Sequence, residues 1–217
     1  MKYKTLIWDL DGTLLDTLQD LAEAVNHALR TCGMPERSID EVRQFVGNGI
    51  RMLMRRAVPG GDENPRFEEC FAEFRAYYML HSQDHTCLYP GIGETLQTLH
   101  SMGVRMAVVS NKLQAGVDRL YQTWFQDTIE VAIGERPELR RKPAPDMVDQ
   151  ALRELGVRAD EAVYVGDSDV DIQTARNSGL PCISVLWGFR SREVLEEAGA
   201  TCFVDKPNDI ITIIQEI

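Results

Sequence analysis

The sequence has little of what a secreted, zinc-stabilised or membrane-spanning protein needs. Its cysteine count, five in 217 residues, is odd, and no Cys-x-x-Cys pair occurs, which argues against a disulfide framework or a zinc site. No apolar run approaches the roughly 20 residues of a membrane span, and the N-terminal segment is too short and too charged for a signal peptide. We therefore expect reduced thiols and a cytoplasmic protein.

Basic charge is also scarce. The chain carries 23 Lys and Arg against 34 Asp and Glu, a formal charge of −11. Because an acidic surface repels phosphate backbones and no basic patch offsets it, neither a nucleic acid nor a membrane is expected as a partner. The composition, 44% hydrophobic and 26% charged, is that of a folded globular protein with one large domain or two small ones.

Short β-prone runs alternate with helical patterns along most of the chain. Such alternation predicts βαβ units, and therefore an α/β fold with a doubly wound, Rossmann-like parallel sheet. The expected strands are residues 5–8, 104–109, 162–165 and 182–186. The expected helices between them include residues 94–102, 113–121 and 147–155.

Residues 16–85 break this alternation. Two apolar stripes at helical spacing occur there, and no convincing strand is present. The α/β pattern resumes after this segment, at the Tyr89-Pro90-Gly91 turn. We therefore predict a helical cap domain over 16–85, inserted into an α/β catalytic core made of 1–15 and 86–217.

Polar residues follow several of the expected strands. Asp9-Leu10-Asp11-Gly12 ends the first strand, Ser110-Asn111 the second, and Gly166-Asp167-Ser168 a later one. The carboxyl ends of parallel strands meet at one edge of a sheet, where the following helices also begin. These clusters are therefore expected to converge on one rim.

The first cluster carries two carboxylates, Asp9 and Asp11. They are two residues apart, so both side chains would face the same side of a regular strand, and Gly12 allows a sharp turn after them. Adjacent carboxylates repel each other unless a metal or a proton neutralises them, so the pair indicates a divalent cation site. A solvated acidic turn is the alternative, but it explains poorly the position after an apolar strand.

Asp167 and Asp171 form a second acidic pair, four residues apart. They would share one face if a helix begins near Ser168. The alternative is that Asp167 or Ser168 caps this helix, with Asp169 and Asp171 complementing its dipole. For this segment alone both interpretations stay open, and the carboxylates of the first strand favour the metal site.

Three further residues are candidates for binding phosphate. Lys142 lies in a loop stiffened by two prolines, where an ammonium suits neutralising a phosphate; a solvated basic loop is the alternative. Ser110 and Asn111 follow a strand and can donate hydroxyl and amide hydrogen bonds to phosphate oxygens, although Ser-Asn is also an ordinary turn.

These motifs occur in a recognisable order. Asp-Leu-Asp-Gly-Thr, then Ser after the second strand, Lys-Pro-x-Pro, and Gly-Asp-Ser-x-x-Asp resemble the four motifs of the haloacid dehalogenase superfamily of phosphohydrolases. The helical insertion resembles the subgroup with a cap between the first two motifs. Val46-Gly47-Asn48-Gly49, Arg56-Ala57, Tyr89-Pro90-Gly91 and Tyr164-Val165-Gly166-Asp167-Ser168 resemble its phosphoglycolate phosphatase branch.

The resemblance implies roles for particular residues. Asp9 would attack phosphorus to form an aspartyl-phosphate, and Asp11 would protonate the leaving oxygen and then activate water. Mg²⁺ would be held by Asp9, the Asp11 backbone carbonyl and Asp167, with Asp171 a direct or outer partner. Ser110, Asn111 and Lys142 would hold the phosphoryl group. The implied substrate is phosphoglycolate or a similar small phosphorylated metabolite.

Other members of the superfamily give alternatives. Pyrophosphatases, sugar-phosphate phosphatases and phosphosugar mutases share these motifs. Dehalogenases lack the second carboxylate of the first motif, and phosphonate-cleaving members need a cap lysine, whereas no lysine lies between Lys4 and Lys112. A noncatalytic receiver-like binding module is the alternative from another class, and the large insertion argues against it.

The insertion contains candidates for substrate specificity. Gly47-Asn48-Gly49 is either a helix-start turn or a cap loop facing the active site, and Arg51 or Arg55 is suited to a bidentate contact with a substrate carboxylate. A dinucleotide fingerprint is excluded because Met52 replaces the third glycine and no strand precedes the segment.

For the oligomeric state, the sequence is compatible with both a monomer and a homodimer.

Overall fold

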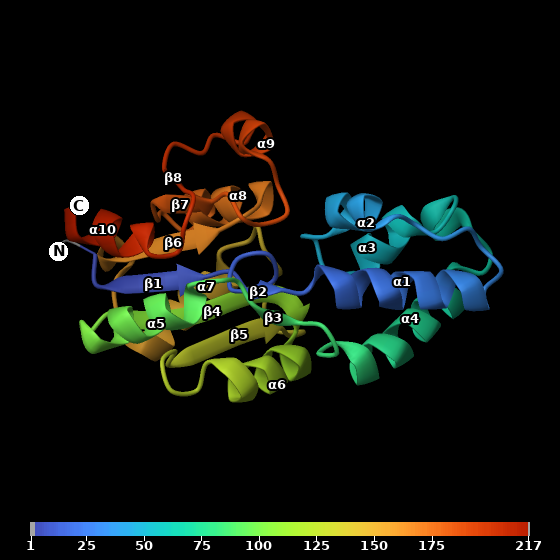
Figure 1. The fold of residues 1–217 in the computed structure, drawn as a ribbon, viewed down its shortest axis with the longest axis horizontal. Coiled ribbons are helices and arrows are strands. Elements are labelled where there is room, and N and C mark those ends of the chain that lie inside the picture. The colour runs from blue at the N-terminus through green and yellow to red at the C-terminus, as the bar shows by residue number, and fades with distance from the viewer. Residues whose placement is uncertain (1–2, 217) are drawn as a thin grey trace. The chain divides into compact units, whose positions relative to one another are not determined.

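The chain forms two units in a computed structural model that describes residues 3–216 (Figure 1). The first unit runs to Leu14 and resumes at Leu88, and the second comprises Leu15–Cys87. The predicted insertion, residues 16–85, has nearly the same limits as this second unit.

A six-stranded parallel sheet forms the centre of the first unit. Its strand order is β5-β4-β1-β6-β7-β8, so the chain winds outward from β1 in one direction and then from β6 in the other. The strands are β1 (Thr5–Trp8), β4 (Arg105–Leu113), β5 (Val131–Glu135), β6 (Ala162–Gly166), β7 (Cys182–Val185) and β8 (Phe203–Val204). This order confirms the doubly wound α/β prediction, and its switch point lies between β1 and β6.

Helices connect these strands. They are α5 (Ile92–Ser101), α6 (Gln114–Trp124), α7 (Asp146–Leu155), α8 (Asp169–Asn177), α9 (Arg192–Glu197) and α10 (Asp209–Glu216), with a 3-10 turn, η2, at Ala159–Glu161. Ile7 of β1 packs with Tyr164 of β6 and with Met147 of α7 in one buried cluster. Leu6 and Trp8, which point to the opposite face of the strand, are buried as well, so both faces of the sheet are covered.

The expected strands and helices of this unit are present, with two differences. Strands β5 and β8 were not predicted; both are short edge strands, and β5 contains a glycine, which weakens a β-strand pattern. In addition, β4 continues past the predicted end at residue 109 to Leu113. Its pairing with β5 shifts register between Val109 and Leu113, and this bulged end carries Ser110, Asn111 and Lys112 as buried residues.

The second unit is a helical bundle. It contains α1 (Leu18–Thr31), α2 (Ile39–Phe45), α3 (Ile50–Ala57), α4 (Phe67–His81) and the 3-10 turn η1 (Gly61–Glu63). Helix α1 packs against α2 and α4 through the apolar stripes that the sequence contains. Two short strands, β2 (Leu15–Asp16) and β3 (Cys87–Leu88), pair with each other, so the expectation of no strand in 16–85 misses β2.

A buried carboxylate joins the two ends of this bundle. Asp20, in the first turn of α1, accepts hydrogen bonds from the backbone N–H groups of His85 and Thr86, at 2.9 and 3.0 Å, and from the Thr86 hydroxyl at 2.6 Å. Three donors satisfy the carboxylate that burial would otherwise destabilise. Asp20 therefore has a structural role, which the sequence pattern did not reveal.

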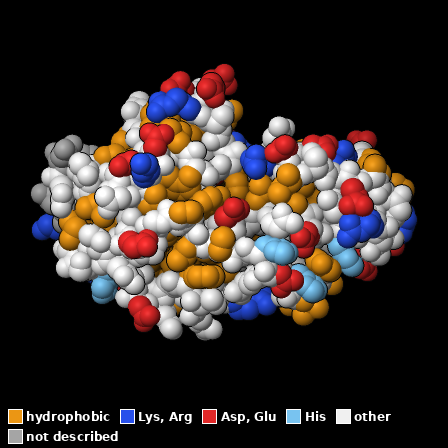
Figure 2. Space-filling model, in the orientation of Figure 1, with side chains coloured by type: hydrophobic (Ala, Val, Ile, Leu, Met, Phe, Trp, Pro, Cys, Tyr) orange, Lys and Arg blue, Asp and Glu red, His pale blue; other side chains and the backbone are white. Residues whose placement is uncertain are grey.

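The helical unit carries charged side chains of both signs on its surface. On the face drawn in Figure 2, acidic and basic side chains of the helical unit are interspersed rather than gathered by sign.

Within residues 3–216, no helix combines the length and the apolar character that crossing a membrane would require.

Candidate active site

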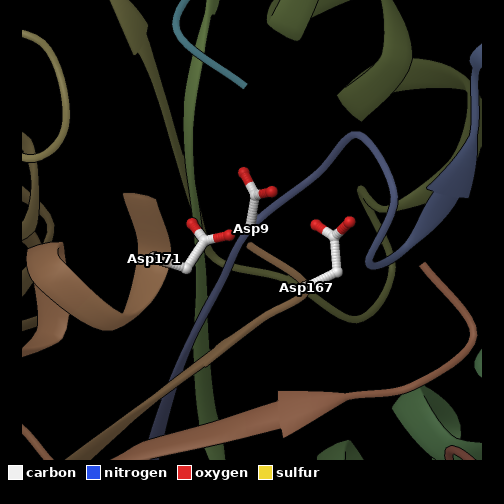
Figure 3. Close-up of side chains that lie close together, drawn as sticks. All are labelled: Asp9, Asp167 and Asp171. Atoms are coloured by element: carbon white, nitrogen blue, oxygen red, sulfur yellow. The ribbon is translucent and has the colours of Figure 1, made fainter. Parts of the chain in front are cut away.

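Three carboxylates gather at the carboxyl ends of the central strands. Asp9 directly follows β1, Asp167 follows β6, and Asp171 lies in the first turn of α8. Each offers an oxygen within 4.8 Å of the others, and all three residues are buried. Figure 3 shows that their carboxyl groups come from three separate elements and face a common region. This position is the switch point of the sheet, where doubly wound proteins bind ligands.

Lys142 is the cation of this cluster. Its Nζ donates to Asp9 Oδ1 at 2.6 Å, to Asp171 Oδ1 at 2.8 Å and to the Tyr164 hydroxyl at 3.0 Å. The residue is only 5% exposed, which rules out the solvated basic loop considered from the sequence. A buried ammonium with two carboxylate partners is held in one place.

Asn111 holds the backbone of Lys142. Its side-chain Oδ1 accepts from the Lys142 N–H at 2.8 Å, and its Nδ2 donates to the Lys142 carbonyl at 3.1 Å. The Ser110 hydroxyl accepts from the backbone N–H of Lys112 at 3.2 Å. The structure thus brings Asn111 to the Lys142 loop, while the phosphate-binding roles of Ser110 and Asn111 stay predictions.

Asp171 is also part of a helix start. Ser168 is the N-cap residue of α8, and its backbone N–H and hydroxyl both donate to Asp171 Oδ2, at 3.1 and 2.6 Å. The other oxygen, Oδ1, accepts from Lys142 and from the Tyr164 hydroxyl, the latter at 3.1 Å. One carboxylate therefore serves both purposes considered from the sequence: Oδ2 of Asp171 stabilises the start of the helix, and Oδ1 belongs to the acidic cluster around Lys142.

The carboxylate of Asp167 is oriented by the backbone. The Phe189 N–H donates to its Oδ2 at 2.7 Å, and the Thr13 hydroxyl lies 3.3 Å from Oδ1. Two glycines leave space for it: a Cβ at Gly12 would lie 2.5 Å from Asp167 Oδ2, and one at Gly188 would lie 2.6 Å from the same atom. No side chain other than hydrogen fits at either position without moving Asp167.

The proximity of these carboxylates changes their acidity. Burial, together with the charge of Asp171, raises the pKa of Asp167 to about 7. Burial and Asp171 also raise the pKa of Asp9 well above its usual range, although Lys142 opposes this shift. Burial lowers the pKa of Lys142, but Asp171 and Asp9 outweigh it and the net pKa is raised. One ammonium therefore does not neutralise three carboxylates.

Asp11 lies apart from this cluster. Its carboxylate pairs with Lys112, whose Nζ donates to Asp11 Oδ1 at 3.0 Å, and it is not among the three gathered carboxylates. Lys112 lies on β4, beside Asn111, and its side chain is 6% exposed. Of the four acidic residues predicted at the metal, three thus come together through their side chains.

Sequence reasoning missed several residues of this site. Four groups each contact one of the acidic side chains: Lys112, Tyr164, Thr13 and the backbone N–H of Phe189. Lys112 directly follows the predicted Ser110-Asn111, so its place in that motif was the one available signal. For Tyr164 and Phe189 only the folded arrangement reveals the contact. Tyr164 lies on β6 and its partner Asp171 on the following helix, while Phe189 donates from its backbone.

The candidate specificity residues of the helical unit have partners within that unit. Arg51 pairs with Glu68, with a 3.2 Å contact between Nη1 and Oε2, and Arg55 pairs with Asp62 at 3.0 Å. Asn48 precedes α3, whose N-cap is Gly49, and its Oδ1 accepts from Arg56 at 2.8 Å. Gly47-Asn48-Gly49 is thus a helix-start turn, and a contact of these residues with substrate stays a prediction.

The fold and the acidic cluster agree with one family. The chain belongs to the haloacid dehalogenase-like hydrolases, whose family model matches residues 6–185. This match confirms the resemblance seen in the four motifs and the prediction that the chain is an enzyme.

Individual relatives are more specific. The chain is 34% identical over 209 residues to a phosphoglycolate phosphatase of Pseudomonas syringae pv. tomato, covering 93% of this chain and 76% of the relative. It is 36% identical over 189 residues to a phosphoglycolate phosphatase of Rhodobacter capsulatus, covering 85% of each. Among solved structures, a candidate phosphoglycolate phosphatase from Lactobacillus delbrueckii subsp. bulgaricus superimposes with a TM-score of 0.94 at 36% identity, covering 99% of both chains.

Proposed function

We propose that this protein is a Mg²⁺-dependent phosphomonoester hydrolase that works through an aspartyl-phosphate, and that its substrate is phosphoglycolate or a similar small phosphorylated metabolite. The observation that carries the proposal is the cluster of Asp9, Asp167 and Asp171 around Lys142 at the switch point of the sheet. The names of the relatives support the choice of substrate.

The residues present fit a divalent cation. Three buried carboxylates face one buried ammonium, so the cluster as it stands carries excess negative charge. Burial, together with the charge of Asp171, raises the pKa of Asp167 to about 7. Hard cations prefer carboxylate oxygens, and a charge of +2 would balance this excess. Asp9 and Asp167 would hold the ion with the Asp11 carbonyl, Asp171 being a direct or outer partner. When bound, the ion supplies charge neutralisation for the phosphoryl group.

The chemistry then divides between two carboxyl groups. In the first step, an Asp9 oxygen bonds to phosphorus as the bond to the leaving oxygen breaks, and that oxygen takes a proton from Asp11. In the second step, water gives a proton to Asp11 and the water oxygen bonds to phosphorus. The bond between the Asp9 oxygen and phosphorus breaks, and inorganic phosphate leaves. Lys142 offsets the negative charge beside Asp9, and Ser110 and Asn111 donate to phosphoryl oxygens.

The division of labour between the units is part of the same proposal. The first unit is the catalytic core, and the second, Leu15–Cys87, is the cap, in which Asn48, Arg51 and Arg55 are the candidate residues for substrate selection. The expected cytoplasmic location likewise stays a proposal, supported by five cysteines that are all free thiols in the structure.

A phosphate-release screen tests the proposal directly. Purified protein is assayed with phosphoglycolate, pyrophosphate, sugar phosphates and nucleotides, each with Mg²⁺ and with excess chelator. We expect Mg²⁺-dependent release and the highest kcat/KM for phosphoglycolate. A preference for pyrophosphate or for a sugar phosphate would contradict the proposed substrate but would leave the proposed Mg²⁺-dependent hydrolysis standing. No release from any member of the panel would sink the hydrolase assignment and revive the binding-module alternative.

A further inference from the structure

A second buried lysine lies beside the site, and the reaction above gives it no task. Lys112 is 7% exposed, and its Nζ donates to Asp11 Oδ1 at 3.0 Å. Burying an ammonium is unfavourable unless charged or polar groups compensate, and the Asp11 carboxylate is one such group. Lys112 therefore places a second buried cation directly beside the carboxyl group proposed as the acid.

The surroundings of Lys112 fix where its ammonium lies. The side chain starts from the bulged end of β4, and its stem runs along Gly116 in the first turn of α6. A Cβ at Gly116 would lie 3.4 to 3.5 Å from Cγ, Cδ and Cε of Lys112, an ordinary van der Waals distance, so the stem lies against this turn of the helix. The ammonium is thereby directed toward the carboxylate of Asp11 rather than toward solvent.

This location has a consequence for the substrate. In the proposed function, on which this inference rests, Asp11 delivers a proton to the leaving oxygen, so the leaving group must lie against Asp11. An ammonium 3.0 Å from the same carboxylate then lies next to the atoms that follow the leaving oxygen. In a phosphorylated hydroxy acid, a carboxylate is separated from that oxygen by one carbon and falls within hydrogen-bond reach of Nζ.

We propose that Lys112 is a specificity-determining residue that binds a second anionic group of the substrate, the carboxylate of the leaving group. Without substrate, Asp11 is its partner, and the incoming carboxylate competes for the ammonium. The preferred substrates are accordingly phosphate monoesters of small 2-hydroxy acids. This assigns part of substrate selection to the core unit, independently of the helical unit.

The decisive measurement is a ratio of two substrates. Phosphoglycolate and ethyl phosphate present the same scissile bond and similar size, but ethyl phosphate lacks the carboxylate. Any effect of Lys112 that acts only through Asp11 changes both substrates alike, since both leaving oxygens need a proton. The ratio of their kcat/KM values therefore isolates the contact with the carboxylate.

We expect Lys112→Met to lower this ratio by roughly 10- to 100-fold, the effect of losing a hydrogen bond to a charged group. Lys112→Arg keeps the charge and should keep most of the preference. Lys206→Met, at an exposed position of the same unit, is the matched control and should leave the ratio unchanged. Circular dichroism and the melting temperature establish that each variant is folded.

Several outcomes would overturn the inference. An unchanged ratio in folded Lys112→Met, or an equal loss on both substrates, means that Lys112 does not bind the carboxylate. If Lys112→Met does not fold, Lys112→Gln, which retains an N–H donor without the charge, takes its place. If neither folds, a wild-type enzyme that turns over both substrates equally overturns the proposal. Wild-type protein inactive on the whole phosphate panel indicates instead that the proposed function itself is wrong.

Discussion

Two ion pairs, one from each unit of this protein, have the same length and differ in burial. In the α/β unit, Lys142 and Asp171 form an ion pair whose side chains are 3% and 1% exposed. In the helical unit, Arg30 and Glu36 form a pair at the same distance, 2.8 Å, with side chains 56% and 49% exposed. Distance alone does not distinguish the two pairs, and burial does.

Burial changes what an ion pair can do. Water screens the charges of an exposed pair, so the pair contributes little to stability. A buried pair interacts strongly with every neighbouring charge, as the raised pKa values of Asp9 and Asp167 show. Strong mutual interaction is what metal binding and phosphoryl transfer require, so the buried charges of the α/β unit are the ones suited to chemistry.

The largest predicted difference between the units comes from one substitution made in both. Asp9→Asn removes the proposed nucleophile and should lower kcat by roughly 10⁴-fold or more. Asp62→Asn, which removes the exposed partner of Arg55, should change kcat less than about twofold. Phosphate release under Mg²⁺ measures both. Near-normal release by Asp9→Asn would remove Asp9 from the mechanism.

A second comparison removes one cation from each unit. Lys142→Met leaves Asp9 and Asp171 without their buried ammonium, and should lower the free energy of unfolding by about 3–5 kcal/mol in metal-free protein at pH 8. Arg30→Met breaks an exposed pair and should not shift the urea midpoint measurably. Equal midpoints for the two variants would contradict the contrast drawn between buried and exposed pairs.

The pH dependence of stability provides a third test, confined to the α/β unit. Asp167 has a pKa of about 7 in the folded protein, against about 3.9 for an unfolded chain. Between these values the folded state binds a proton that the unfolded state has lost, so metal-free stability should fall as pH rises from about 4 to 7. The raised pKa of Asp9 acts in the same direction.

Mg²⁺ should reverse this trend, because the ion binds the ionised carboxylates. We expect saturating Mg²⁺ to raise Tm by about 5–10 °C at pH 8 and by much less at pH 5. Asp167→Asn should abolish most of the increase at pH 8, whereas Asp62→Asn in the helical unit should retain it. An equal increase at both pH values would argue that these carboxylates do not bind the ion.

The smallest effect is expected in the helical unit. The guanidinium of Arg51 pairs with Glu68 and lies 5.0 and 5.2 Å from the ring centroids of Phe67 and Phe71. With these partners, Arg51→Ala should leave kcat unchanged and alter KM for phosphoglycolate less than about threefold. A tenfold higher KM would instead support the specificity role predicted for Arg51 and give the helical unit a share in recognition.

Much of the α/β fold was accessible from sequence patterns. Strand β1 was predicted with its observed limits, and α7 differs from its prediction by one residue, because buried strands and amphipathic helices leave strong local patterns. Strands β5 and β8 were missed because a short edge strand pairs with a distant segment and carries little local pattern of its own. The end of β4 was missed because its polar residues resemble a turn when their burial is unknown.

Sequence patterns revealed the residues of the candidate site but not the contacts between them. Asp9, Asp11, Lys142 and Asp167 stand in motifs whose order is visible along the chain, and three of them converge in the structure. The partner of Asp11 lies 101 positions away, and that of Asp9 lies 133 positions away. No local pattern connects residues so far apart.

The sequence by itself determined the class of fold, the family and the residue types available for chemistry, because periodicity and short motifs are local properties. Only the tertiary structure decided which charges share one buried space. It put Lys142 between Asp9 and Asp171, and Lys112 against Asp11. The physical reason is that electrostatic interaction depends on distance through space and on exclusion of water, and packing alone sets both.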